Sequence, residues 1–231
     1  MAGSIEHVLA AAIFFVGTHF ALAMTPVRPW LAARLGENGF LGFYSAVAIL
    51  GLVWLGFAYR QAPYVELWPL TRPALWLALA AMPVAVFLVV AGLSTPSPTG
   101  VGGERAFDQT NPARGILTIT RHPVMSGIAL WAATHVLANG DAGSVILFGA
   151  LLALAVGGMV HIDAKKRDRM GAAWGPFAMT TSVVPFQAIF EGRATFDAAG
   201  IGWRRVIVAV VLFAFLVWAH PWISGVALIV R

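Results

Sequence analysis

The sequence predicts an all-α fold: a polytopic membrane helix bundle with about six transmembrane helices and one interfacial or re-entrant segment. Hydrophobic residues make up 59% of the chain, charged residues make up 11%, and the mean hydropathy is +0.81. Soluble domains carry roughly twice this share of charge. At roughly 20 residues per span, 231 residues have room for about six or seven helices. We therefore expect one transmembrane domain over residues 1–231.

Apolar runs without charged residues mark the expected spans. They cover residues 8–24, 39–59, 73–93, 123–140, 142–160 and 206–230. No basic residue precedes the first run, so we interpret it as a retained span and not as a cleaved signal peptide. Pro221 predicts a kink or an end in the last span, because proline cannot donate the helical hydrogen bond.

Proline and glycine mark the longest connection between the spans. The stretch that begins at Ser94 is rich in Pro, Gly and Ser, and we expect a loop that continues to about Thr118. Loops of this length are often functional. The uncharged stretch 174–190 contains Pro176 and Pro185. We interpret it as an interfacial or re-entrant segment buried against protein, because a broken helix cannot face lipid.

The basic residues predict the orientation of the bundle. In a six-span arrangement twelve Lys and Arg residues fall on one side, and three, Arg60, Arg72 and Arg231, fall on the other. Cytoplasmic loops carry the excess of basic residues. We expect cytoplasmic basic loops, both termini outside, and a bacterial inner (cytoplasmic) membrane. The net charge of +5 then reflects topology, and we expect no nucleic-acid partner.

Histidines are the main candidates for metal or haem ligands. The chain has no cysteine, which excludes disulfides, thiolate ligands, iron–sulfur clusters and covalent haem attachment. Of the six histidines, His19 and His135 lie deepest within the expected spans. Two neutral imidazoles on facing helices are the usual axial ligands of a b-type haem in a bundle. A neutral histidine in a span can equally hydrogen-bond a neighbouring helix.

Helical geometry limits which histidines can bind one iron. On one straight helix, His122 and His135 would face about 220° apart and lie roughly 20 Å apart. His19 must therefore come from another helix. His122 stays in reserve as a ligand, because His19 lies about 10 Å nearer the cytoplasmic side than His135 if the first helix ends at Pro26. Trp131 shares a face with His135, and Arg121 is the better candidate to bind haem propionates.

Several motifs resemble the NnrU family across nearly the whole chain, and in particular its 15-cis-zeta-carotene isomerase branch. They are ITRHPVMSG, LWAATHVLANGD, TSVVPFQAIFEGR, the final AHP, GTHFALA and LGENGFLGFYS. The resemblance implies a membrane protein that binds haem b and isomerises the central cis bond of a linear polyene. The family's ligand histidines match His19 and His135. A lipophilic polyene, the lipid bilayer and an electron donor to the haem are the implied partners.

One position departs from the isomerase pattern. The isomerases carry a cysteine three residues before the second histidine, and this chain has Ala132 there. Switching between thiolate and imidazole ligation is therefore impossible here.

Two other functions stay open. NnrU is associated with nitrite and nitric oxide reduction, which is compatible with an accessory protein that has no turnover of its own. RHPVMSG followed by a final VPF also resembles membrane methyltransferases related to isoprenylcysteine carboxyl methyltransferase. Lys165 and Lys166 stand about where those enzymes need an acidic pair, and their charge would repel a cationic cofactor.

Overall fold

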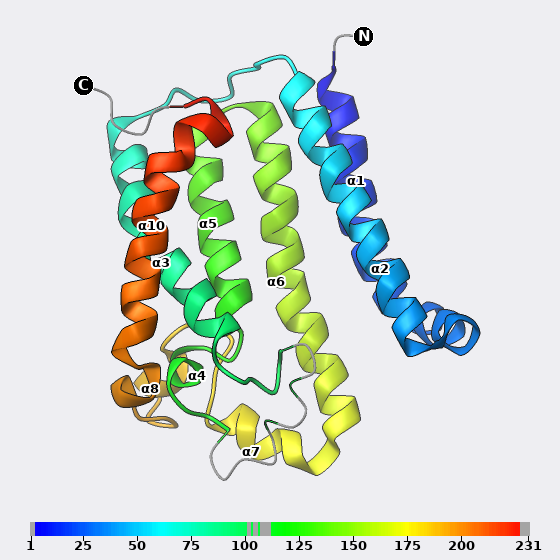
Figure 1. The fold of residues 1–231 in the computed structure, drawn as a ribbon, viewed down its shortest axis with the longest axis vertical. Coiled ribbons are helices and arrows are strands. Elements are labelled where there is room, and N and C mark those ends of the chain that lie inside the picture. The colour runs from blue at the N-terminus through cyan, green and yellow to red at the C-terminus, as the bar shows by residue number, and fades with distance from the viewer. Residues whose placement is uncertain (1–2, 101–102, 104–105, 107–111, 227–231) are drawn as a thin grey trace. The chain divides into compact units, whose positions relative to one another are not determined.

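The structure is a computed structural model, and it describes residues 3–100, 103, 106 and 112–226. These residues form helices joined by turns and loops, and they contain no β-strand. The helices are α1 (Ile5–Ala23), α2 (Val27–Gln61), α3 (Arg72–Leu93), α4 (Ile116–Ile119), α5 (Pro123–Asn139), α6 (Ala142–Met170), α7 (Trp174–Met179), α8 (Gln187–Phe190), α9 (Ala198–Ile201) and α10 (Trp203–Ser224) (Figure 1). The predicted all-α fold is confirmed.

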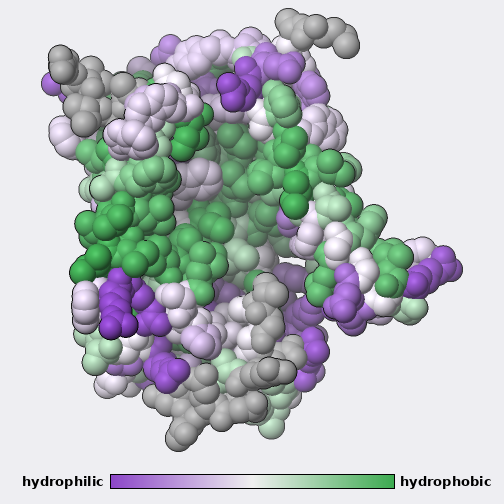
Figure 2. All heavy atoms as spheres, viewed as in Figure 1, coloured by the Kyte–Doolittle hydropathy of each residue, from purple (hydrophilic) through white to green (hydrophobic). Residues whose placement is uncertain are grey.

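Each expected span overlaps one helix, and residues 227–230 of the last expected span lie outside the described residues. By length and composition, four helices (α1, α2, α3 and α10) and the run Ala142–Met179 could each cross a membrane. Helix α5 carries the remaining expected span and has 17 residues, somewhat short of the roughly 20 that a span needs. Figure 2 shows apolar side chains gathered along the middle of the helices and polar ones near their ends. This distribution fits a protein that lies in a membrane.

The chain divides into two compact units. The first comprises residues 1–76 and 132–154, and the second comprises residues 77–131 and 155–231, so α5 and α6 each contribute to both.

In the first unit, α1 lies along α2 (Figure 1). Its buried core consists of Val8, Ala11, Ala12, Phe15, Leu55 and Ala58. A Cβ atom built on Gly51 would lie only 3.3 Å from the Phe15 ring. Small residues therefore allow α1 and α2 to approach closely, as is common between membrane helices.

Helix α2 begins well before residue 39, where the second expected span begins. The helix begins at Val27 and is interrupted at Gly36, whose φ of 73° is non-helical. Residues such as Leu31, Ala32 and Ala33 favour a helix, and glycine adopts a positive φ without steric cost. The sequence forms a short helix there, followed by a break and the long span.

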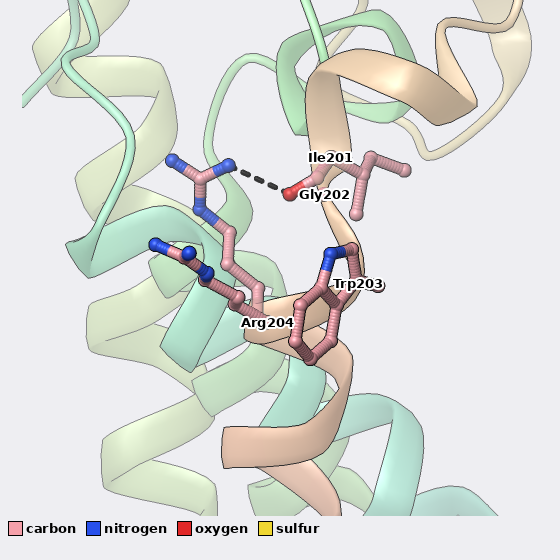
Figure 3. A pocket seen from close by; sticks show the side chains of 5 residues that line it. Ile201, Gly202, Trp203 and Arg204 are labelled. Atoms are coloured by element: carbon pink, nitrogen blue, oxygen red, sulfur yellow. Dashed lines mark hydrogen bonds between the residues drawn. The ribbon is translucent and has the colours of Figure 1, made fainter.

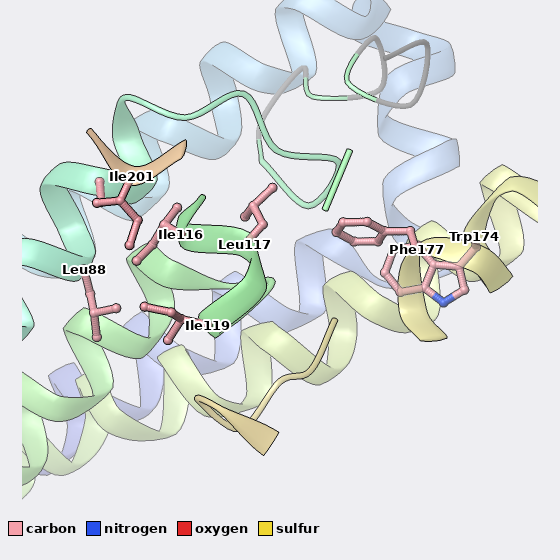
Figure 4. Close-up of a cluster of buried hydrophobic side chains, with 8 residues drawn as sticks. Leu88, Ile116, Leu117, Ile119, Trp174, Phe177 and Ile201 are labelled. Carbon is pink, nitrogen blue, oxygen red and sulfur yellow. The ribbon is translucent and has the colours of Figure 1, made fainter. Parts of the chain in front are cut away.

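The second unit has its own apolar core, drawn in Figure 4. Leu88 and Ala91 of α3 belong to a cluster with Ile116, Leu117 and Ile119 of α4, Trp174 and Phe177 of α7, and Ile201 of α9.

Glycines bring α3 and α5 together: a Cβ built on Gly127 would lie 2.7 Å from the Ala85 carbonyl oxygen. The loop expected from Ser94 to about Thr118 ends earlier, because α4 begins at Ile116. Residues 101–102, 104–105 and 107–111 of this loop lie outside the described residues.

The stretch 174–190 is a broken helix. It forms α7 and α8, and Phe186 between them adopts the left-handed conformation with φ 66°. Trp174, Phe177, Thr181, Ser182 and Ala188 are buried, so one side of the segment packs against protein. The other side, which includes Met179, Val184 and Phe190, is exposed, so the segment is only partly buried. Its depth in a membrane stays a prediction.

Helix α10 continues through Pro221, the position where a kink or an end was expected, and ends three residues later at Ser224.

Candidate functional site

His19 is held in a defined orientation inside α1. Its Nδ1 atom lies 2.6 Å from the Phe15 carbonyl oxygen, one helical turn earlier. A carbonyl oxygen only accepts hydrogen bonds, so Nδ1 carries the hydrogen and the lone pair of the neutral ring is on Nε2. Fixing one ring nitrogen on a backbone carbonyl is the usual way in which proteins orient a histidine ligand.

Aromatic rings surround the His19 imidazole. The Phe15 ring lies at a centroid distance of 4.4 Å, and the Tyr44 ring of α2 lies at 5.6 Å, both edge to face. The side chain of His19 is half-buried. This environment restricts the rotation of the imidazole.

His135 lies on α5 in the same unit as His19. Its ring packs on Phe148 of α6 with centroids 4.7 Å apart. Asn139 donates from its side-chain amide to the His135 carbonyl oxygen at 2.7 Å, which closes the last turn of α5. Trp131, half-buried, lies one turn before His135 on the same helix.

The donor chemistry of these two histidines fits a haem iron. The described residues contain no group of three or more His, Cys, Asp or Glu side chains that could hold a metal ion. A haem iron needs only one or two protein ligands, because the porphyrin supplies the other four.

Neighbouring residues of α6 face the α1–α2 core and the His135 ring. Leu147 of α6 packs against the core of α1 and α2, whereas Phe148, the next residue and roughly 100° further around the helix, contacts His135. The assignment of His19 and His135 as a ligand pair stays a prediction.

A second cluster forms where α5 begins, and its centre is Asp163 of α6. Arg121 Nε donates to Asp163 Oδ2 at 2.9 Å, and His122 Nε2 lies 2.7 Å from Asp163 Oδ1. An ionised carboxylate only accepts, so His122 Nε2 carries the hydrogen. The side chains of Arg121, His122 and Asp163 are 14%, 1% and 11% exposed. We call these three residues the RHD cluster.

Backbone bonds connect the RHD cluster to the broken segment. The Arg121 N–H donates to the Ser182 carbonyl at 2.9 Å, and the Phe186 N–H donates to the Ile119 carbonyl at 2.8 Å. Arg121 Nη1 also donates to the Thr181 carbonyl at 3.2 Å. The motifs ITRHP and TSVVPF, about sixty residues apart in sequence, therefore form one structural element.

These contacts bear on two expected ligand roles. The Nε and Nη1 atoms of Arg121 bind protein groups, and His122 presents its Nε2 to a carboxylate. In this arrangement His122 Nε2 does not offer a lone pair to iron. The roles of Arg121 with propionates, of His122 as a reserve ligand and of Trp131 beside a haem stay predictions.

Asp163 was not among the residues singled out from the sequence. It lies in HIDAKKRDR, a stretch with four basic residues. Those residues indicate the end of a span and do not point to a role for Asp163. The useful signal was a carboxylate just beyond an apolar run, in a chain that also carries a buried Arg-His pair. A charge so placed needs a partner.

Comparisons with known proteins match this chain to one family. A family profile described as NnrU protein matches residues 7–228. The chloroplastic 15-cis-zeta-carotene isomerases of Zea mays and Arabidopsis thaliana are 37% and 38% identical to this chain over 79 residues. Those residues are 34% of this chain and 22% of each relative, so the match spans about a fifth of the relatives' length. No solved structure matches the chain.

Proposed function

Because this chain belongs to the NnrU family, we propose that it is a haem b-binding membrane isomerase that turns one cis double bond of a linear polyene such as 15-cis-zeta-carotene. The observation that carries this proposal is the similarity of 79 residues to two proteins named as isomerases of that compound. The orientation of His19, with its lone pair on Nε2, supports the haem part.

His19 and His135 would hold the haem as axial ligands. A bound haem would supply an iron that contacts the polyene and lowers the barrier to rotation about one double bond. Ala132, fully buried on α5, offers no thiolate. With His19 and His135 as the pair, imidazole nitrogens would hold the iron in both the oxidised and the reduced state, and an electron donor must reduce it.

The surface of the first unit suits a substrate that arrives through lipid. Ile13 of α1 and Ile49 and Leu50 of α2 expose 61% or more of their surface, and all three are apolar. A polyene dissolved in the bilayer can move along such a surface without crossing water. Phe15 and Tyr44 pack around the His19 ring and limit the access of water to it.

Turnover tests this proposal directly. The purified protein in detergent, reduced with dithionite, is incubated with 15-cis-zeta-carotene, and the isomers are separated by chromatography. We expect loss of the central cis bond without consumption of any cosubstrate, because isomerisation transfers no atoms. Carbon monoxide should block the reaction by binding reduced haem. Unchanged isomer ratios with fully haem-loaded, reduced protein would overturn the isomerase assignment.

An accessory role in nitrite or nitric oxide reduction is the second candidate. The observation that favours it is the NnrU profile, which covers residues 7–228, whereas the isomerase similarity covers 79 residues. A reduced, haem-loaded protein that is inert towards the polyene, together with altered nitrite or nitric oxide metabolism in a host that lacks it, would favour this role. The family match favours both candidates over a methyltransferase.

A further inference from the structure

We propose that the junction of α3 and α10 binds an anionic phospholipid, with its phosphate at Arg204 and Arg205 and an acyl chain between the two helices. The proposal does not depend on the isomerase function. It combines a basic cavity at the start of α10 with an apolar groove that begins one residue further along the same helix.

The cavity surrounds the first turn of α10. It has a volume of about 350 Å³ and is lined by Ile201, Gly202, Trp203, Arg204 and Arg205 (Figure 3). Pockets that hold small molecules are commonly about 300–1,000 Å³. The cavity is therefore large enough for a phosphate with its glycerol.

Hydrogen bonds hold the Arg205 side chain in place where it lines this cavity. Its Nε donates to the Ser94 hydroxyl at 2.8 Å, and its Nη2 donates to the Ser94 carbonyl at 2.9 Å. Its Nη1 donates to the Ile201 carbonyl at 2.6 Å, the bond drawn as a dashed line in Figure 3. These acceptors are neutral, so the positive charge of Arg205 is not cancelled by them. The residue connects the end of α3 to the start of α10 and keeps its charge at the cavity.

Arg204 provides the second charge and is exposed. Its guanidinium carbon lies 5.8 Å from the centre of the Trp203 ring, and no hydrogen bond or ion pair is found for it within residues 112–226. The Asp197 carboxylate, nearby in sequence, accepts from the backbone N–H groups of Gly115 and Gly200, both at 2.8 Å. The N-cap residue Gly202 has no side chain to bind the free N–H groups of the first turn. The exposed Arg204 guanidinium and the free N–H groups of the first turn favour an anion, and Asp197 forms no ion pair with Arg204 because its carboxylate is bound to the backbone.

The groove accounts for the lipid part of the proposal. It has a volume of about 240 Å³ and is lined by Pro83, Val84 and Phe87 of α3 and by four apolar residues of α10, from Val206 to Phe213. Val206 directly follows Arg205. The groove extends roughly 10 Å along α10, about two thirds of the ~15 Å hydrocarbon depth of one leaflet.

The side chain of Trp203 marks the expected depth of this site. It is 69% exposed at the point where the apolar helix begins. Exposed tryptophans are enriched where lipid headgroups meet the hydrocarbon. A phosphate at Arg204 and an acyl chain along Val206 and Val210 match that level of the bilayer.

The test is native mass spectrometry of the full chain in detergent with phosphatidylglycerol or phosphatidylcholine. We expect phosphatidylglycerol to bind at least about fivefold more tightly, because each basic residue near an anionic headgroup contributes on the order of that factor. Arg204→Gln should weaken its binding about fivefold, and Arg204→Lys should retain most of it. The matched control is Arg34→Gln, because Arg34 is also exposed and lies 4.1 Å from the Trp30 ring.

Two further measurements distinguish binding of a lipid from binding of a free phosphate. Val210→Trp, at a position that is 60% exposed, should fill the groove and weaken phosphatidylglycerol binding without affecting glycerol phosphate. Circular dichroism of each variant confirms that it is folded. Equal binding of the two lipids, equal losses in Arg204→Gln and Arg34→Gln, or full displacement of the lipid by millimolar inorganic phosphate would overturn the proposal.

Discussion

Asp163 and His122 lie 2.7 Å apart through Oδ1 and Nε2, although 41 residues separate them in sequence. His122 directly precedes α5, and Asp163 lies in α6. With Arg121 they form a buried cluster in which one carboxylate balances one permanent cation and binds one imidazole. This cluster joins ITRHP, HIDAKKRDR and TSVVPF, three stretches of the second unit.

Removing the carboxylate should destabilise the second unit. We expect Asp163→Asn to lower the free energy of unfolding by about 3–5 kcal/mol, because Arg121 would remain as a buried charge without its counter-ion. Unfolding of the detergent-solubilised protein, followed by circular dichroism, measures the loss. Asp168→Asn is the matched control, since Asp168 is exposed on the same helix. Equal stability of the two variants would mean that the RHD cluster contributes nothing.

Packing of α3 on α5 requires glycine at position 127. A Cβ there would lie 2.7 Å from the Ala85 carbonyl oxygen, a backbone atom that cannot move away easily. Gly127→Ala should therefore cost about 1–3 kcal/mol of stability. Gly149→Ala on α6 has nothing within 4 Å of its new Cβ. That control should be neutral or up to about 1 kcal/mol more stable, through helix propensity alone. A neutral Gly127→Ala would contradict the close packing.

The proposed ligand pair can be separated from the other histidines. His19→Ala and His135→Ala should each lose haem or leave it high-spin, because a strong axial field needs both imidazoles. His7→Ala should retain a low-spin spectrum, since His7 accepts a hydrogen bond from Trp54 Nε1 at 2.8 Å near the start of α1. A low-spin spectrum in His135→Ala, combined with its loss in His122→Ala, would transfer the role to His122.

The expected orientation is testable because the chain has no cysteine. The excess of basic residues places Lys166 in the cytoplasm and Ser4 outside. In intact spheroplasts, a membrane-impermeant thiol reagent should label Ser4→Cys and spare Lys166→Cys. Permeabilised cells, in which both should react, control for accessibility. The reverse pattern in intact cells would invert the topology.

The long apolar runs predicted the helices well, because a membrane span needs about 20 apolar residues whatever its neighbours. The kink in α2 was missed: Gly36 breaks the helix, but the residues before it still favour a helix of their own. The broken stretch after α6 was recognised from Pro176 and Pro185, since proline limits which backbone can form.

The candidate site was less accessible to prediction. His19 and His135 were singled out because an ionisable group in a span is rare, and their role as ligands stays a prediction. The partnership of Asp163 with His122 was not found, because it depends on how α5 and α6 pack, and helical periodicity within one segment does not contain that information. Arg121 was identified, but its hydrogen bonds to Asp163 and Thr181 emerged only from the structure.

The absorption spectrum of the purified protein in detergent, recorded oxidised and then reduced with dithionite, most directly tests the central claim that this chain holds haem b through histidines. We expect a low-spin b-type spectrum whose Soret band shifts on reduction, and whose intensity falls in His19→Ala and in His135→Ala. Colourless protein that is correctly folded and comes from haem-replete cells would contradict the claim.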